Sequence, residues 1–271
     1  MWRMVWLVDL IKAFWQEKIM KTILYGLVLL PVVLFAQINE SDSISVKAGL
    51  ALTGVWQSGN VETRIFRTKS DFSVKPGKPW VFKTTNSYVY QEFGKVKADE
   101  DILSLNFLYL NPQRKLYPFV LGIASTNFRR EIDIRFLFGA GATLQLLNEK
   151  TFWLKLSISS EYETTEFASA DFNRSAYDGS PSIRTYRGTV WIYGKYFLHN
   201  KKIVLSHEAY VQPSLEKSDN YRWQADLGLE LPFWKFLNFR INYLDVFESV
   251  VIENQKQHDR LLTFGFSVKN Y

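Results

Sequence analysis

Serine next to histidine is the arrangement in this chain that could activate a hydroxyl nucleophile, and it occurs at Ser206 and His207. Ser214 is a second candidate partner for the same imidazole. Adjacent residues on a strand point to opposite faces, and Ser214, seven residues beyond His207, is again opposite. Neither hydroxyl should therefore reach the ring. We expect no catalytic residues, and a barrel-wall hydrolase of the outer-membrane phospholipase type is the enzyme alternative.

Residues that could hold a metal or a phosphate are isolated from one another. His199 and His258 fall in a predicted turn and at a loop end, and the chain has no cysteine to add a thiolate. The acidic run at 97–101, which we expect in a loop, lacks the spaced ligands and central glycine of a calcium site. The Gly-Ala-Gly at 139–141 precedes no helix, so a phosphate-binding role is not expected. We expect no metal and no cofactor.

Charged residues recur at every second position of several extended segments. Both signs are interspersed, which is typical of a salt-bridged interior and unlike the one-sign rings of a strongly selective pore. We expect them to line the lumen of a barrel; the candidates are Arg67, Lys69, Asp71, Arg135, Lys155, Glu161, Glu163, Arg187, Lys195, Glu208, Arg222, Asp226, Glu230 and Arg240.

The segments that carry these charges alternate between apolar and polar residues over about 10 to 14 positions, longer than a usual soluble strand. In 133–147, Phe136 and Phe138 share one face, while Arg135 and Thr143 share the other. This length suits a tilted strand that crosses a bilayer. We predict twelve strands, at about 44–57, 61–75, 80–92, 102–111, 116–128, 133–147, 152–164, 183–198, 202–214, 221–232, 236–248 and 259–271.

The predicted connections sort by parity. The even-numbered connections are short, at 76–79, 111–115, 148–150, 199–202 and 232–235. The first odd-numbered connection, 58–60, is also short, but the other odd-numbered ones are longer, at 92–101, 127–133, 166–182, 215–220 and 248–258. Outer-membrane barrels have short periplasmic turns and longer outer loops. The sequence thus predicts an all-β, transmembrane, antiparallel up-and-down β-barrel of about 12 strands (10 to 14 possible) over 44–271, its apolar face toward lipid. A soluble, lipid-binding β-protein is the alternative.

Composition agrees with a membrane wall. Aromatic residues make up 16% of the chain, and barrels concentrate them in girdles at both interfaces. We expect Tyr221, Trp223 and Tyr243 in the outer girdle, Phe233 and Trp234 at the periplasmic interface, and Tyr271 as the terminal aromatic. The net charge of +6 is dispersed, so no nucleic-acid partner is expected. A lumen of twelve strands should be narrow if it is open.

The N-terminal part predicts export. Residues 20–36 combine a lysine, an apolar stretch and a small residue, Ala36, as in a secretory signal peptide. Residues 1–19 are then an upstream extension before a start at Met20, and 37–43 a short periplasmic segment. We expect the protein in the outer membrane of a Gram-negative bacterium.

Two stretches carry a resemblance to a known family. "GLALTGVWQSGNVETR" and "RFLFGAGATLQLL", with the aromatic end at Tyr271, are similar to the domain of unknown function 481 family, often labelled salt-induced outer-membrane protein, from about residue 44 onward. The resemblance implies an exported barrel. We expect it to be monomeric, with outer-membrane lipid and the barrel-insertion machinery as partners. Its molecular role is unestablished, so we expect a narrow channel or an envelope component linked to salt or osmotic stress. Tyr271 is out of phase with Phe264 and Phe266.

Overall fold

The computed structural model describes residues 40–41, 45–58, 62–77, 79–149, 151–234 and 237–268. These residues belong to one compact unit of the chain, Leu34–Tyr271. The expected upstream extension 1–19, the signal peptide 20–36 and Tyr271 lie outside the described residues, as does most of 37–43. In the part described, no helix is long and apolar enough to cross a bilayer.

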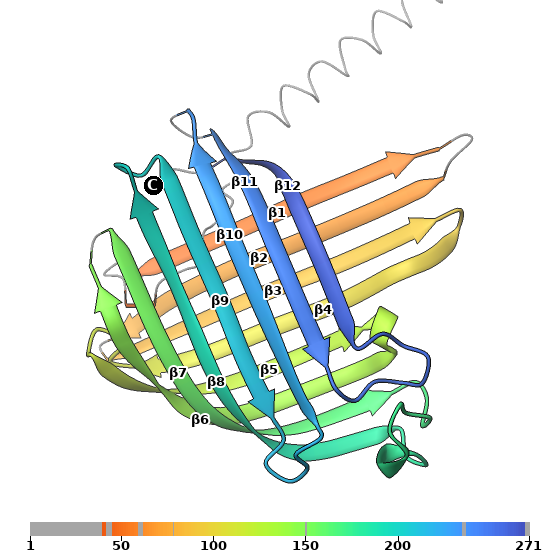
Figure 1. The fold of residues 1–271 in the computed structure, drawn as a ribbon. Coiled ribbons are helices and arrows are strands. Elements are labelled where there is room, and N and C mark those ends of the chain that lie inside the picture. The colour runs from red at the N-terminus through yellow and green to blue at the C-terminus, as the bar shows by residue number, and fades with distance from the viewer. Residues whose placement is uncertain are drawn as a thin grey trace, which may run out of the picture. The chain divides into compact units, whose positions relative to one another are not determined.

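Twelve strands form one sheet in which each strand pairs antiparallel with its neighbours in the chain (Figure 1). Two short 3-10 helices, η1 (Phe128–Arg130) and η2 (Ser175–Tyr177), lie in connections. The strands are β1 (Val46–Gln57), β2 (Thr63–Gly77), β3 (Trp80–Phe93), β4 (Val96–Leu110), β5 (Leu116–Asn127), β6 (Ile132–Asn148), β7 (Phe152–Phe167), β8 (Ser182–Leu198), β9 (Ile203–Pro213), β10 (Tyr221–Pro232), β11 (Leu237–Glu248) and β12 (His258–Val268). The prediction of an up-and-down antiparallel barrel fold with about twelve strands is confirmed.

Alternation along the central strands decides which side chains are buried. On β6, Phe138 is 71% exposed while Thr143 is fully buried, and on β7 Ile158 is 57% exposed while Lys155 is fully buried. Two glycines let these strands come together. A Cβ at Gly139 would lie 2.2 Å from the Ser160 carbonyl oxygen, and one at Gly141 would lie 2.3 Å from that of Ile158. Close backbone approach therefore explains both glycines.

The sheet curls until distant strands touch through side chains. The rings of Phe107 on β4 and Trp191 on β8 are 5.7 Å apart. An Nη atom of Arg135 on β6 lies 2.8 Å from a carboxylate oxygen of Glu248 on β11. Within the described residues, no backbone pairing joins β1 to β12.

One expected loop is wrong. The stretch 92–101 continues β3 and β4 instead of connecting them, and only Gly94 and Lys95 form the turn. Both have positive φ, 57° and 67°, as a two-residue hairpin turn that matches strand twist requires. The charged side chains of β4 pair along the strand and across it: Lys97 with Glu100 at 2.8 Å, and Tyr88 with Glu100 at 3.2 Å. The sorting of connection lengths by parity therefore fails at this position.

The expected orientation of the apolar face is also wrong for β4 and β5. Their buried face is apolar and includes Phe107, Tyr109, Tyr117, Phe119 and Leu121, with Val81 of β3 packed at its edge. The opposite face carries a chain of hydrogen bonds, in which Ser104 donates to Asn86 at 2.7 Å and Asn106 donates to Ser104 at 3.0 Å. One wall of the interior is therefore apolar. From the sequence pattern alone, this face was expected to contact lipid.

Candidate functional site

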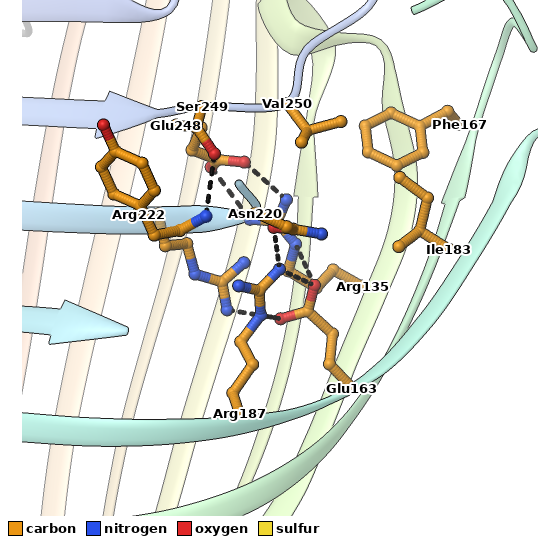
Figure 2. Close-up of a pocket in the computed structure, with 11 residues that line it drawn as sticks. Arg135, Glu163, Phe167, Ile183, Arg187, Asn220, Arg222, Glu248, Ser249 and Val250 are labelled. Carbon is orange, nitrogen blue, oxygen red and sulfur yellow. Dashed lines mark hydrogen bonds and ion pairs between the residues drawn. The ribbon is translucent and has the colours of Figure 1, made fainter. Parts of the chain in front are cut away.

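Glu163 on β7 is the centre of a buried charge network at the end of the sheet where the longer connections lie, here called the loop end. Arg187 Nε and Nη2 donate to its two carboxylate oxygens at 2.7 and 3.0 Å. Arg222 Nη2 donates at 2.6 Å, and Arg135 Nε lies 3.9 Å away. Figure 2 shows the three guanidinium groups turned toward this carboxylate. Glu163 is 1% exposed, so the network works in a poorly screened environment.

Glu248 at the end of β11 extends this loop-end network across the interior. Arg135 donates to both of its carboxylate oxygens, at 3.0 and 2.8 Å, the bidentate geometry that arginine favours. Arg130 Nη1 lies 3.6 Å from Glu248, and Arg130 Nη2 lies 2.7 Å from Asp259 on β12. The η1 turn presents Arg130, whose backbone N–H is capped by the Asn127 side chain. Strands β6, β7, β8, β10, β11 and β12 are thereby joined through side chains.

Two connections cover the loop-end network. The β7–β8 connection (168–181) and the β11–β12 connection (249–257) pair through an antiparallel bridge between Phe172 and Ile252. Their apolar side chains form a cluster with the ends of the strands: Ile132, Phe167, Phe172, Tyr177, Ile183, Val250 and Ile252. The Tyr177 hydroxyl donates to Asp219, and burial together with that carboxylate raises the Tyr177 pKa. The loop end is therefore closed by a packed lid.

A single carboxylate is buried at the opposite end, here called the turn end. One oxygen of Glu40 accepts hydrogen bonds from Tyr117 (2.6 Å), Lys155 (2.9 Å) and Tyr193 (2.9 Å). Burial alone would raise the Glu40 pKa, but the charges of Lys155 and Lys83 and the Tyr117 hydrogen bond lower it to about 2. Ser41 accepts from Lys155 at 2.9 Å and donates to the Pro112 carbonyl in the β4–β5 turn. We call Tyr117, Lys155 and Tyr193 the Glu40 seat.

A cavity of about 180 Å³ lies between the two closures. Its apolar side is formed by β4, β5 and β6 with Leu103, Leu105, Phe107, Leu121, Ile123 and Leu137. Its polar side is formed by β7 to β10 with Ser159, Glu161, Thr189, Glu208, Gln212, Arg222 and Gln224, and with Trp191 and Tyr210. Arg135 and Arg222 also line a water-sized space of about 10 Å³ beneath the lid, so they separate the two volumes.

The structure brings some of the predicted lumen residues together and leaves others apart. Arg135, Arg187 and Arg222 meet around Glu163, and Lys155 lies in the Glu40 seat. Glu161 accepts from Thr189 at 2.8 Å and from Ser159. The others are dispersed. Asp71 accepts a hydrogen bond from Thr85, Arg240 donates one to Asn242, and Lys195 is buried 5.2 Å from the Phe197 ring centre. In the strand register Glu230 lies opposite Arg240 and Asp226 opposite Glu208, while Arg67 and Lys69 are exposed on β2.

The predicted girdle residues are placed as follows. Tyr221 and Trp223 lie near the loop end, with their ring centres 5.5 and 6.1 Å from that of Phe247. Phe233 and Trp234 follow β10 at the turn end and are 58% and 75% exposed. Tyr243 pairs in register with Leu227, in the middle of the β10–β11 pair and away from Tyr221.

Several residues of the loop-end network and of the turn end were not among the candidates from sequence, including Glu248, Arg130 and Glu40. Glu248 shares the phase of Arg240 on β11, so the alternation could have identified it. Arg130 lies in a connection, where no strand phase applies. Glu40 precedes the first strand, and no pattern near it indicates that it folds back against residues 77, 115 and 153 positions away.

The residues considered for catalysis are separated. His207 stacks on the Tyr196 ring with centres 5.7 Å apart. The Ser214 hydroxyl bonds the Thr185 hydroxyl at 2.6 Å, and Ser206 pairs in register with Lys195 and Gly228. In the residues that the structure describes, no group of three or more histidine, cysteine, aspartate or glutamate side chains could hold a metal ion.

Comparisons with known proteins add the following. The NanC porin structure matches with 11% identity and a TM-score of 0.45, covering 83% of this chain and 98% of that one. The translocator domain of autotransporter NalP from Neisseria meningitidis matches with 15% identity and a TM-score of 0.42, covering 95% and 96%. No curated protein matches the sequence. The model of the family described as "Protein of unknown function, DUF481" matches residues 46–269, and the chain belongs to that family.

Proposed function

We propose that the protein is an outer-membrane β-barrel that is closed at rest and conducts small solutes only when one of its two closures moves. The observation that carries this proposal is the Glu40 seat. There Glu40, which precedes β1, is held inside the wall by an ion pair with Lys155 in which the two side chains are 1% and 0% exposed. Because Glu40 is not part of a strand, it can leave this position without breaking the backbone pairing of the wall.

Exposed apolar side chains support the membrane location. Phe138, Leu262 and Phe264 are 71%, 63% and 77% exposed, and they lie on strands of 17 and 11 residues. An apolar face of this kind is costly in water and favourable in hydrocarbon. Extraction from membranes without detergent would contradict the proposal. Folded protein in detergent should migrate faster on a gel than the same sample after boiling.

Buried charges support a filled interior. Removing one partner of a buried ion pair typically costs about 3–5 kcal/mol, since the other charge is left without compensation. The loop-end network shares Glu163 and Glu248 among four guanidinium groups. Opening that end would break several such pairs together. The turn end, with one carboxylate, is the closure that we expect to open first.

Conductance in planar bilayers tests the proposal. Wild-type protein should give long closed intervals with brief openings. Glu40→Ala should increase the open fraction by about tenfold or more, as expected for a loss of at least about 1.4 kcal/mol from the closed state. Glu149→Ala is the matched control, because Glu149 is exposed in the β6–β7 turn at the same end. A steady current from wild-type protein that Glu40→Ala leaves unchanged would refute the closed resting state.

We further propose that the barrel is not an enzyme and acts as a monomer inserted by the barrel-insertion machinery. His207 lies on the face of β9 that carries Leu205 and Val211, both partly exposed to the surroundings of the wall. A phospholipid hydrolysis assay of wild-type and His207→Ala protein tests this proposal. Activity that is lost in the variant would establish the hydrolase instead. The link to salt or osmotic stress is an expectation from the family label, and growth of a deletion strain in high salt tests it.

A further inference from the structure

We propose that the Glu40 seat is a binding site for small monocarboxylates, which the Glu40 side chain fills in the resting protein. This inference deepens the proposed function, because it names the class of solute that would reach the seat. It rests on that function in one respect, namely that Glu40 can leave. It is carried by the donors around one carboxylate oxygen, by the sign of the charges near it and by the rings that enclose them.

The seat already holds a carboxylate in the structure. Oε1 of Glu40 accepts from the hydroxyls of Tyr117 on β5 and Tyr193 on β8 and from the ammonium of Lys155 on β7, at 2.6, 2.9 and 2.9 Å. Tyr117 and Lys155 are 0% exposed and Tyr193 is 4% exposed. Because all three donors belong to strands of the wall, we expect them to remain together when the residue that they bind leaves.

The charges around the seat select an anion. Those that act on Glu40 are the ammonium groups of Lys155 and Lys83, and both are positive. Lys83 also interacts with the carboxylate of Glu208, so Lys155 is the charge that a bound anion would compensate. A buried ammonium that loses its counterion is strongly destabilising. A neutral molecule or a cation in place of Glu40 would leave that ammonium uncompensated.

The rings around the ammonium favour a monoanion with a short apolar part. Lys155 Nζ lies 5.7 Å from the ring centre of Tyr117 and 5.6 Å from that of Trp153. The Trp153 ring packs edge-on against Tyr193, with centres 5.9 Å apart. The cost of moving an ion out of water into such buried surroundings grows with the square of its charge, so phosphate and sulfate dianions are disfavoured. Propionate reproduces the Glu40 side chain beyond Cα.

Glu40 is an imperfect occupant of its own seat. Oε1 accepts all three hydrogen bonds, whereas Oε2 is buried and has no hydrogen-bond partner among the described residues. A buried acceptor without a donor costs free energy. The backbone limits how the Glu40 carboxylate can turn, and a free carboxylate has no such limit. A solute can therefore compete with the tethered side chain, whose effective concentration is on the order of millimolar for a short flexible tether.

Chemical rescue tests the binding site without a conductance measurement. Full-length Glu40→Ala protein in detergent is titrated with propionate, with neutral propionamide and with chloride at equal ionic strength, and its thermal unfolding is followed by tryptophan fluorescence. We expect a saturable rise of the unfolding midpoint with propionate, because a ligand that binds only the folded state stabilises it. Propionamide should give no more than chloride does. Equal stabilisation by propionamide, or none by propionate, would overturn the proposal.

Two further variants locate the effect. Lys155→Met in the Glu40→Ala background replaces the ammonium by an apolar side chain and should abolish the propionate response, because no buried charge remains to be compensated. Glu149→Ala, at an exposed position in the β6–β7 turn, should gain no stability from propionate. Faster gel migration before boiling establishes that each variant is folded. A propionate response that survives Lys155→Met would place the anion elsewhere and overturn the assignment.

Competition in the wild-type protein separates this inference from the proposed function. Propionate should release the N-terminal segment, followed by an attached fluorophore, at concentrations about tenfold or more above those that stabilise Glu40→Ala, since it must displace a tethered carboxylate. Rescue of Glu40→Ala without segment release in the wild type would support the binding site and contradict the proposed function. A raised open fraction in a Glu40→Ala protein that binds no carboxylate would support the proposed function and overturn this inference.

Discussion

The buried charges at the two ends of the interior are arranged differently. At the loop end, charges from six strands interlock, and each belongs to the wall or to its connections. At the turn end, one carboxylate from the segment before β1 meets one ammonium and two hydroxyls. If the proposal is right, opening the loop end disturbs the sheet, whereas Glu40 at the turn end can leave without unpairing a strand.

The largest expected effect comes from the centre of the loop-end network. Glu163→Gln leaves Arg187 and Arg222 buried against a neutral amide, which should cost about 3–5 kcal/mol of unfolding free energy. Urea unfolding of protein in detergent measures it. Glu253→Gln, at an exposed position in the β11–β12 connection, is the control and should stay within about 0.5 kcal/mol. A loss below about 1 kcal/mol in Glu163→Gln would remove the distinction between the two ends.

An intermediate effect is expected from acid. The Glu40 pKa is depressed to about 2, so its ion pair contributes stability above pH 4.5 that is lost as pH falls toward 2. The depression corresponds to roughly 3 kcal/mol. Release of the N-terminal segment, followed by proteolysis or by an attached fluorophore, should therefore rise between pH 4.5 and 2. Glu40→Gln should release the segment at neutral pH and show no such pH dependence; an unchanged profile in that variant would assign the titration to another group.

The smallest effects compare single hydrogen bonds at the two ends. Tyr117→Phe removes one donor to Glu40, and Asn220→Ala removes one acceptor from Arg187. Each should lower the unfolding free energy by about 1–3 kcal/mol, because one hydrogen bond to a buried charged group is lost. Only Tyr117→Phe should also increase segment release. Equal segment release in both variants would show that the two closures are coupled.

The strand pattern was readable from sequence because burial on one side of a sheet imposes a period of two. That rule correctly predicted that Arg135, Lys155 and Arg222 lie on the interior face of the sheet. It could not tell the inside from the outside for β4, where Leu105 and Phe107 face the interior and Asn106 does not. The alternating sequence pattern is the same whether the apolar residues face the interior and the polar residues the exterior, or the other way round. Only contacts with other strands, such as Phe107 with Trp191, distinguish the two cases.

Charge was the second source of error. Residues 97–101 look like a solvated loop because they are acidic, yet they continue β4 and pair with β3. Hydrogen-bonded pairs such as Tyr88 with Glu100 stabilise strand ends that project beyond a buried region. The Glu40 seat could not be predicted at all, because its three partners come from β5, β7 and β8 and meet only when the sheet has curled.

The order of assembly follows from that seat. Glu40 is synthesised before every strand, but its partners lie 77, 115 and 153 residues later in the chain. Contacts of such separation form late, since the intervening chain must first be ordered. The Glu40 seat exists only when β5, β7 and β8 lie together, so Glu40 can dock only after these strands have been placed.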